Sequence, residues 1–359
     1  MRRKMISTTM LIHEENEEDL FDRLPDAILL TIFDKLQDAK SLSISSSLCK
    51  RFRFLTTQTQ HISLAIPSQK YHKLLPFSSR NKLIRFFLKP FQFVYRQISQ
   101  WNPICMPCDN TQKKSDSYSC CTCSYASSSP AEILRNFTEI KELEIRVPSN
   151  GGGGDSDSLL KWKGEFGSQL KNCLIVGGIS LSPICNNDRI DNGDAPIREL
   201  ELQRMTNEDL KLRIVWIISS LIAASARHCL LEEVITEKKL LNKVVIMDDI
   251  GQGKVCMNGE QVEEMRRDAE VFSSKMPALK VKMWYSPELE LPERGCVMKG
   301  ATLVVVKPME EWSKADDGGD LVAKGFGFAG DGKEEKVFDE VARELVKLER
   351  SYSLEMNSF

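Results

Sequence analysis

The sequence has little that would point to secretion, to a membrane span or to a highly charged partner. Its formal net charge is only −2, from 49 basic and 51 acidic residues, which argues against a polyanionic partner. The basic start of the chain is followed by an apolar stretch that is too short and too polar for a signal peptide. The most apolar run, residues 214–225, is shorter than the roughly 20 residues that a membrane-spanning helix needs. We therefore expect an intracellular protein, in the nucleus, the cytoplasm or both, with no transmembrane segment.

Histidine is also scarce, and this weighs against catalysis. The four histidines are His13, His61, His72 and His228, and the first three fall in terminal or linker-like sequence. His228 ends an apolar helical stretch, where we expect a buried and hydrogen-bonded side chain. No metalloprotease, serine-hydrolase or kinase motif is present. The sequence predicts a chain without enzymatic activity and without a cofactor.

Eleven cysteines are spread over the 359 residues, a distribution typical of reduced intracellular thiols rather than of a small disulfide scaffold. Cys105, Cys108, Cys120 and Cys123 form two CxxC pairs, a spacing that can bind a tetrahedral zinc ion. The loop between the pairs is shorter than in a usual zinc ribbon, and its sequence is rich in serine. We favour free thiols here, with a structural zinc site as the alternative.

Two glycine-rich strings resemble nucleotide-binding motifs but lack the required context. Residues 325–330 satisfy G-x-G-x-x-G, yet no strand candidate directly precedes them. Residues 251–254, GQGK, lack the remaining residues of a phosphate-binding loop. We interpret the first string as a loop and the second as a turn.

Changes in sequence pattern divide the chain into four parts. Residues 1–19 are polar and without period, so we expect them to be disordered. Residues 20–60 are helical in pattern, and residues 61–129 form a largely flexible linker or insertion that begins with a strand at 61–66. Residues 130–359 contain a glycine-rich loop at 149–158, six strand candidates, and helical segments near 207–240 and 333–351. The strand candidates are EIKELEIRV, LKNCLIVGG, IRELELQRM, LNKVVIMDD, ALKVKMWYS and ATLVVVKP. Their irregular spacing resembles a degenerate leucine-rich repeat, and a single α/β domain with a mostly parallel sheet fits the same strings.

The helical pattern of residues 20–60 leaves apolar side chains without a partner. Apolar residues recur every three or four positions from Leu24 to Leu36, with Pro25 at the first helical position. A second periodic stretch runs from Leu42 to Phe52. Two helices this short cannot bury all of these side chains between themselves, so we expect a surface that binds another protein.

The string FDRLPDAILLTIFDKLQDAKSLSISSSLCKRFRFL resembles an F-box. Leu-Pro opens the family pattern, Ile-Phe follows at helical spacing, and a Cys-(Lys/Arg)-x-(Trp/Phe) helix closes it. The resemblance implies a three-helix unit that docks onto the Skp-type adaptor of a cullin-RING ubiquitin ligase. The implied adaptor-binding residues are Leu24, Pro25, Ile28, Leu29, Ile32, Phe33, Leu36, Leu42, Leu48, Cys49 and Phe52.

Further strings, among them SPAEILRNFTEIKELEIRVP and the terminal YSLEMNSF, resemble a plant F-box family that includes the auxin-up-regulated F-box proteins. The resemblance implies a non-catalytic substrate-recognition subunit of an SCF-type ubiquitin ligase. It would bind the adaptor, and through it cullin and RING subunits, and an unknown target protein. The expected fold is α/β, with an N-terminal three-helix F-box and an irregular, leucine-rich-repeat-like C-terminal domain. The alternative is a membrane-surface or nucleic-acid-binding regulator that uses the basic and aromatic residues 82–96.

Overall fold

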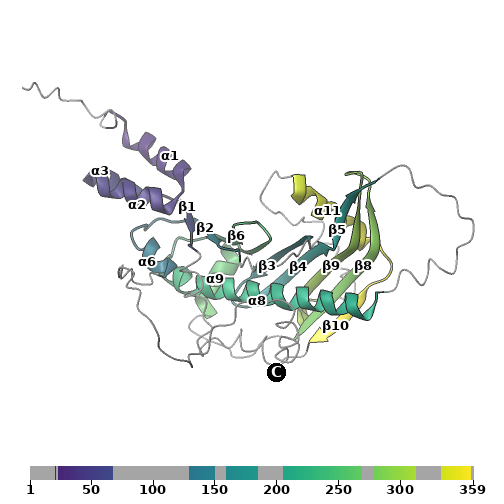
Figure 1. Cartoon of the computed structure of the whole chain (residues 1–359). Helices are drawn as coiled ribbons and strands as arrows, with labels where there is room; N and C mark the ends of the chain where they lie inside the picture. Colours follow the sequence, from purple (N-terminus) through teal and green to yellow (C-terminus); the bar gives the residue numbers. More distant parts are fainter. Residues whose placement is uncertain are drawn as a thin grey trace, which may run out of the picture.

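A computed structural model describes residues 21, 23–67, 129–149, 159–184, 205–268, 278–312 and 333–356. Within these ranges most residues belong to helices or to strands of one sheet (Figure 1). The helices are α1 (Asp26–Leu36), α2 (Ala39–Leu48), α3 (Lys50–Thr57), α6 (Pro130–Leu134), α8 (Asn207–Glu237), α9 (Gly259–Asp268), the 3₁₀ helix η1 (Met309–Glu311) and α11 (Lys333–Val346). The strands are β1 (His61–Ala65), β2 (Glu142–Val147), β3 (Leu159–Phe166), β4 (Leu170–Gly178), β5 (Ser180–Pro183), β6 (Lys243–Asp248), β7 (Gly253–Met257), β8 (Leu279–Leu291), β9 (Cys296–Pro308) and β10 (Tyr352–Met356).

The ten strands form one mixed sheet in the order β1-β2-β6-β7-β3-β4-β9-β8-β10, with β5 attached to β9. The pairs β1/β2, β2/β6 and β3/β7 are parallel, and the other pairs are antiparallel. The mixed α/β class is as expected, but the strands do not stack as leucine-rich repeats and are not mostly parallel. In a repeat each unit contacts only its neighbours, whereas here β3 pairs with β7 and β4 pairs with β9, across long stretches of chain.

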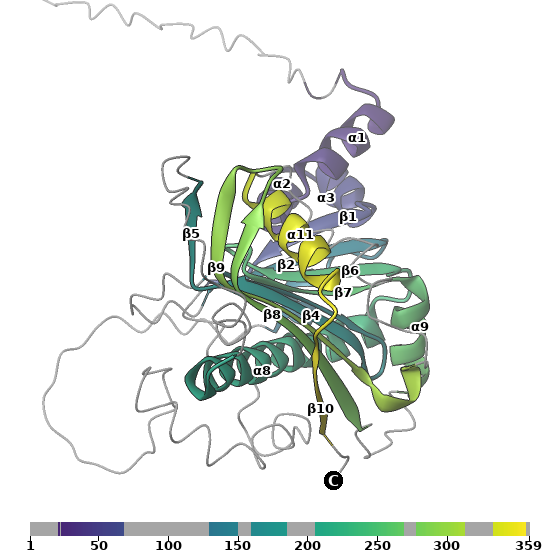
Figure 2. The same cartoon turned by 90° about the vertical axis from the view of Figure 1, so that its right-hand side faces the viewer.

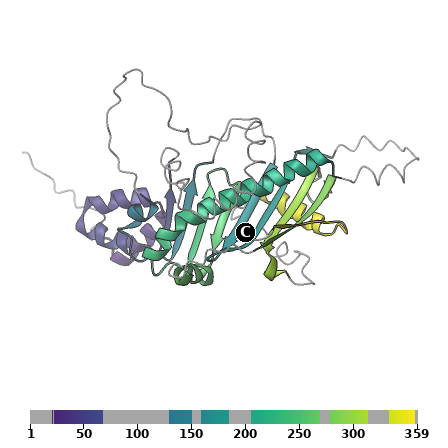
Figure 3. The ribbon, with the colours of Figure 1, turned by 90° about the horizontal axis from the view of Figure 1, so that it is seen from below.

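Helices cover both faces of the sheet. The long helix α8 runs across the strands on one face, and α9 lies beside it (Figure 3). On the opposite face α11 covers β8, β9 and β4 (Figure 2). Each face has its own hydrophobic cluster: Ile217 and Leu221 of α8 belong to one, and Phe338 and Leu345 of α11 belong to the other. The helices α1–α3 sit at the β1 end of the sheet (Figure 1).

The helix α8 contains the apolar run that the sequence predicted to be a buried helix. Among the described residues it is the one helix that is long and apolar enough to cross a membrane, and 67% of its most apolar window is buried in this fold. Ile217 and Leu221 pack in the cluster between α8 and the sheet, and Ile218 is also buried, as expected, whereas Ile214 and Ile222 are only half-buried. These apolar side chains are therefore used mainly for packing on the sheet.

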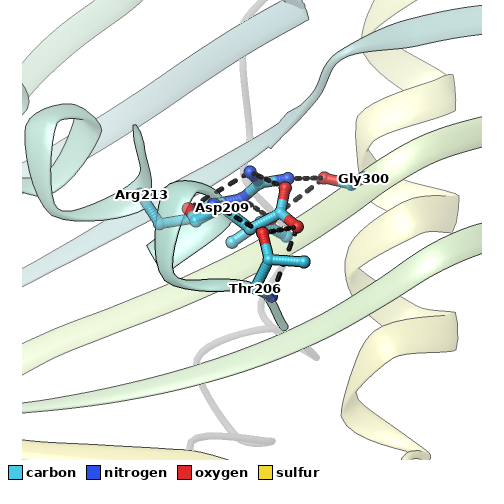
Figure 4. A network of polar contacts seen from close by, with 5 residues as sticks. Thr206, Asp209, Arg213 and Gly300 are labelled. Carbon is cyan, nitrogen blue, oxygen red and sulfur yellow. Dashed lines mark hydrogen bonds and ion pairs between the residues drawn. The ribbon is translucent and has the colours of Figure 1, made fainter. Parts of the chain in front are cut away.

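The start of α8 is held by a buried arginine (Figure 4). Thr206 caps the helix in a reciprocal capping box with Asp209. Arg213, which is fully buried, donates to the Asp209 carboxylate at 2.9 Å, to the Gly300 carbonyl at 3.0 Å and to the Thr302 hydroxyl at 3.1 Å. The network joins α8 to β9, and burial lowers the pKa of the guanidinium from its ordinary value.

Candidate partner-binding surface

The helix α1 divides its apolar residues between two sides. Pro25 is the N-cap, so the helix begins at Asp26, one residue later than the sequence suggested. Leu29 and Phe33 are buried in the core. Ile28, Ile32 and Leu36 are 49%, 43% and 42% exposed, and their spacing of four places them in one row along the helix. We call these three residues the α1 stripe.

The Cys-Lys-Arg-Phe motif at residues 49–52 makes contacts within the three-helix segment. The Cys49 sulfur caps α3 by accepting the Phe52 backbone N–H at 3.4 Å. The Arg51 guanidinium forms an ion pair with Asp26 at 2.7 Å and donates to the backbone carbonyl of Leu24, which fixes the start of α1. The Phe52 ring packs edge-on against Phe33, with 5.4 Å between the centroids. These contacts hold α3 against α1 and thereby position the α1 stripe.

The structure thus separates the residues that the resemblance implied into three sets. Pro25, Ile28, Ile32, Leu36, Leu48 and Cys49 are exposed, Leu24 and Phe52 are half-buried, and Leu29, Phe33 and Leu42 are buried. The buried residues serve the core of the helices and offer no surface to a partner. Only the exposed set, with the accessible parts of Leu24 and Phe52, can contribute directly to an interface.

Three further large apolar side chains in this region are exposed and were not singled out from the sequence. They are Phe21, Ile44 and Phe54, at 50%, 56% and 66% exposure. Ile44 precedes Leu48 by four positions in α2, so these two side chains share a side of the helix. The sequence shows this spacing of four, but the serines on both sides of Ile44 interrupt the apolar periodicity, so the pair was not predicted as a surface.

The helices α1–α3 are joined tightly to the sheet. Leu29, Phe33, Leu42 and Leu55 belong to the same hydrophobic cluster as the sheet residues on the α8 face. The strand predicted at 61–66 is β1, which follows α3 almost directly and pairs with β2. The Ser63 N–H donates to the carbonyl of Gln37 at 2.8 Å, and the Thr138 N–H donates to the carbonyl of Thr57 at 3.1 Å. These contacts give the α1 stripe a defined orientation relative to the sheet.

Of the other sequence motifs, few lie where the structure can describe them. The turn predicted at 251–254 is confirmed only for residues 251–252, because Gly253 and Lys254 begin β7. Gly251 has φ +64°, and the Asp248 carboxylate accepts the N–H groups of Gln252 and Gly253. Cys105, Cys108, Cys120 and Cys123, the basic and aromatic stretch 82–96 and the glycine string 325–330 lie outside the described residues. In the part of the chain that is described, no three His, Cys, Asp or Glu side chains gather to hold a metal ion.

The prediction for His228 is confirmed. Its side chain is buried, its ring stacks on Phe166 with 4.6 Å between centroids, and Nε2–H donates to the Gly167 carbonyl at 2.9 Å. Burial lowers the pKa of His228 to about 4, although the hydrogen bond to Gly167 opposes the shift. The ring is therefore neutral at physiological pH and acts as a packing residue between α8 and β3.

The free energy of unfolding should consequently decrease as the pH is lowered from about 6.5 to about 4, the two pKa values of His228 in the unfolded and folded chain. The unfolded chain takes up the proton near the ordinary pKa of 6.5, whereas the folded chain takes it up only near pH 4. Between these values each pH unit should cost about 1.4 kcal/mol of unfolding free energy, and the loss should level off below pH 4. Urea unfolding between pH 7.5 and 4.5 measures this slope. His228→Gln, which retains a donor without the titration, should show a shallower slope, and equal slopes for the two proteins would contradict the assignment.

Comparison with known proteins gives the chain a family. No protein-family model matches the sequence, and no solved structure matches it either. The F-box protein At4g18380 of Arabidopsis thaliana is 38% identical over 97% of this chain and 96% of its own length. The F-box proteins At1g30200 and AUF2 of the same plant are 36% and 30% identical, over 97% and 95% of this chain. The chain therefore belongs to the plant F-box protein family that includes AUF1 and AUF2.

Proposed function

We propose that this chain is the substrate-recognition subunit of an SCF-type E3 ubiquitin ligase and that its N-terminal helices bind a Skp-type adaptor. The α1 stripe carries the proposal. It is a row of three exposed apolar side chains in the segment whose sequence resembles an F-box, in a chain whose relatives are F-box proteins. An apolar row on a short helix is the kind of surface that lies in a groove of a partner.

The proposed adaptor contact is narrower than the sequence implied. Ile28 and Ile32 would be the central anchors, because they are exposed and adjacent on α1. Leu36 would extend the contact along the helix, and Leu48 and Ile44 of α2 could add to it. Leu29, Phe33 and Phe52 would act indirectly by holding α1 in place.

The sheet and its helices would hold the target protein. Because α1–α3 share a core with the sheet, a bound target would be presented to the rest of the ligase in a restricted orientation. The mechanism is proximity, since tethering raises the effective concentration of a target lysine near the ubiquitin-charged enzyme. Cullin and RING subunits would join through the adaptor, and this chain would contribute no catalytic group. We place this action in the nucleus, the cytoplasm or both.

A binding experiment with the α1 stripe tests the proposal. Ile28→Asp together with Ile32→Asp should weaken binding to a Skp-type adaptor at least about 100-fold, because each truncated anchor typically costs on the order of 2 kcal/mol or more. Affinity would be measured by calorimetry or quantitative pull-down with the full-length chain. Both positions are exposed, so the far-ultraviolet circular dichroism and the thermal transition should remain those of the wild type.

The matched control is Ile250→Asp, which adds the same charge at an exposed isoleucine in the turn between β6 and β7. This variant should bind the adaptor as the wild type does. If a folded protein with the double substitution still binds the adaptor, the α1 stripe is not the adaptor-binding surface, and the proposed docking site is wrong.

A further inference from the structure

The strand β10 ends the sheet and leaves one edge open. It pairs with β8 on one side, and no described strand lies on its other side. Tyr352 and Leu354, which point to the same face, are 41% and 49% exposed. An edge strand of this kind presents unpaired backbone N–H and C=O groups together with apolar side chains, which is a template for pairing with another strand.

Two other edges of the sheet are protected. On β1 the Ser63 N–H bonds to the Gln37 carbonyl, so the loop between α1 and α2 covers that edge. The short strand β5 ends in Pro183, a residue that cannot donate to a neighbouring strand. By contrast β10, with the sequence YSLEM, has no proline and no lysine to discourage pairing.

We propose that the outer edge of β10 binds β10 of a second copy of this chain, antiparallel and across a two-fold axis. An axis at Leu354 places Leu354 opposite Leu354 of the partner subunit and Tyr352 opposite Met356 of the partner subunit. Apolar side chains then face apolar side chains. In the same register Glu355 lies opposite Ser353 of the partner subunit, so the two carboxylates avoid each other. Parallel pairing in register would place the two glutamates face to face, which is unfavourable.

The geometry of the fold allows this dimer and adaptor binding together. The strand β10 and the helices α1–α3 lie at opposite ends of the sheet (Figure 1). Pairing of the two β10 strands would extend the sheet across two copies and leave the α1 stripe of each copy exposed. Only five residues contribute from each side, so the interface falls in the small, transient class and its population depends on concentration.

Sedimentation equilibrium of the full-length chain tests the dimer directly. The average mass should rise from 40.8 kDa toward twice that value as the concentration increases through about 10–100 µM. Leu354→Lys and Leu354→Glu each place like charges at the axis, so each variant alone should weaken dimerisation at least about tenfold. An equimolar mixture should regain it, because lysine then faces glutamate across the axis. Ile250→Lys, at an exposed isoleucine in the turn between β6 and β7, is the matched control and should dimerise as the wild type does.

The outcomes separate this inference from the proposed ligase function. A mass that stays at 40.8 kDa up to about 200 µM would overturn the dimer, as would an unchanged dimer in both Leu354 variants. A mixture that fails to dimerise, although each variant alone is folded and monomeric, would overturn the register. Adaptor binding should be the same in Leu354→Lys as in the wild type, whatever the mass measurements give.

Discussion

Replacing Leu221 by Asp is expected to unfold most of the molecule. Leu221 is 2% exposed and lies in the hydrophobic cluster between α8 and the sheet. A carboxylate there would be buried without a designed partner, at a cost of several kcal/mol against a typical domain stability of about 5–15 kcal/mol. Loss of the cooperative thermal transition, or recovery of the protein only as aggregate, is the expected measurement.

The Leu221→Asp substitution should also weaken adaptor binding, although Leu221 is not part of the α1 stripe. The helices α1–α3 pack into the cluster that contains Leu221, so loss of the sheet removes part of their support. Adaptor binding by the Leu221→Asp protein should therefore fall, although the α1 stripe is unchanged. Leu212→Asp is the matched control, because Leu212 lies on the same helix and is 38% exposed. This control should cost less than about 1 kcal/mol, and equal behaviour of the two variants would show that α8 is not the centre of the core.

Local sequence pattern was enough to predict several elements. The spacing of apolar residues predicted α1 and α8, and the strand candidates LKNCLIVGG and LNKVVIMDD correspond to β4 and β6. The helix α1 and the strand β6 each bury one side that their own sequences display, whereas β4 is buried on both faces. The candidate IRELELQRM lies almost wholly outside the described residues, so its prediction remains untested.

The missed strands depend on neighbours that are distant in the sequence. In β3, charged residues alternate with the buried residues Trp162, Gly164 and Phe166, a local pattern that was not singled out. In β7, Gly253 lies against the Trp162 ring so closely that a Cβ atom would be 2.0 Å from it. Glycine there is required by a residue on another strand. No local pattern contains that information, and the same holds for the pairing of β3 with β7.

The candidate surface shows a similar division. The sequence indicated which residues of α1 are apolar, but not which of them would be buried in the core. Ile28 and Leu29 are neighbours of similar size, and the packing of α1 against α2, α3 and β1 leaves the first exposed and the second buried. The internal roles of Cys49 and Arg51 likewise follow from their contacts with backbone groups.

Arg213→Ala is the second substitution expected to have a large effect. The guanidinium satisfies acceptors on both α8 and β9, and it lies near the rings of Trp216 and Tyr285, 5.2 Å and 5.0 Å from their centroids. Alanine would leave a cavity between these rings and remove one donor each from the Asp209 carboxylate and the Gly300 carbonyl. Asp209 would keep its hydrogen bonds from Thr206, and Gly300 would keep the one from the Thr302 hydroxyl. Truncation of a large buried side chain, together with the loss of its hydrogen bonds, typically costs about 3–5 kcal/mol.

A pair of control variants separates charge from packing. Arg213→Lys retains the charge, but an ammonium cannot reach Asp209, Gly300 and Thr302 with the geometry of a guanidinium, so an intermediate loss is expected. Asp209→Asn keeps an acceptor for Arg213 but removes the counter-charge of a fully buried guanidinium, so a loss of about 1–3 kcal/mol is expected. Denaturant midpoints rank the three variants, and near-ultraviolet circular dichroism reports on the environment of Trp216 and Tyr285. If Arg213→Ala cost less than about 1 kcal/mol, the attachment of α8 to β9 would rest on apolar contacts alone, and the guanidinium would be dispensable to the fold.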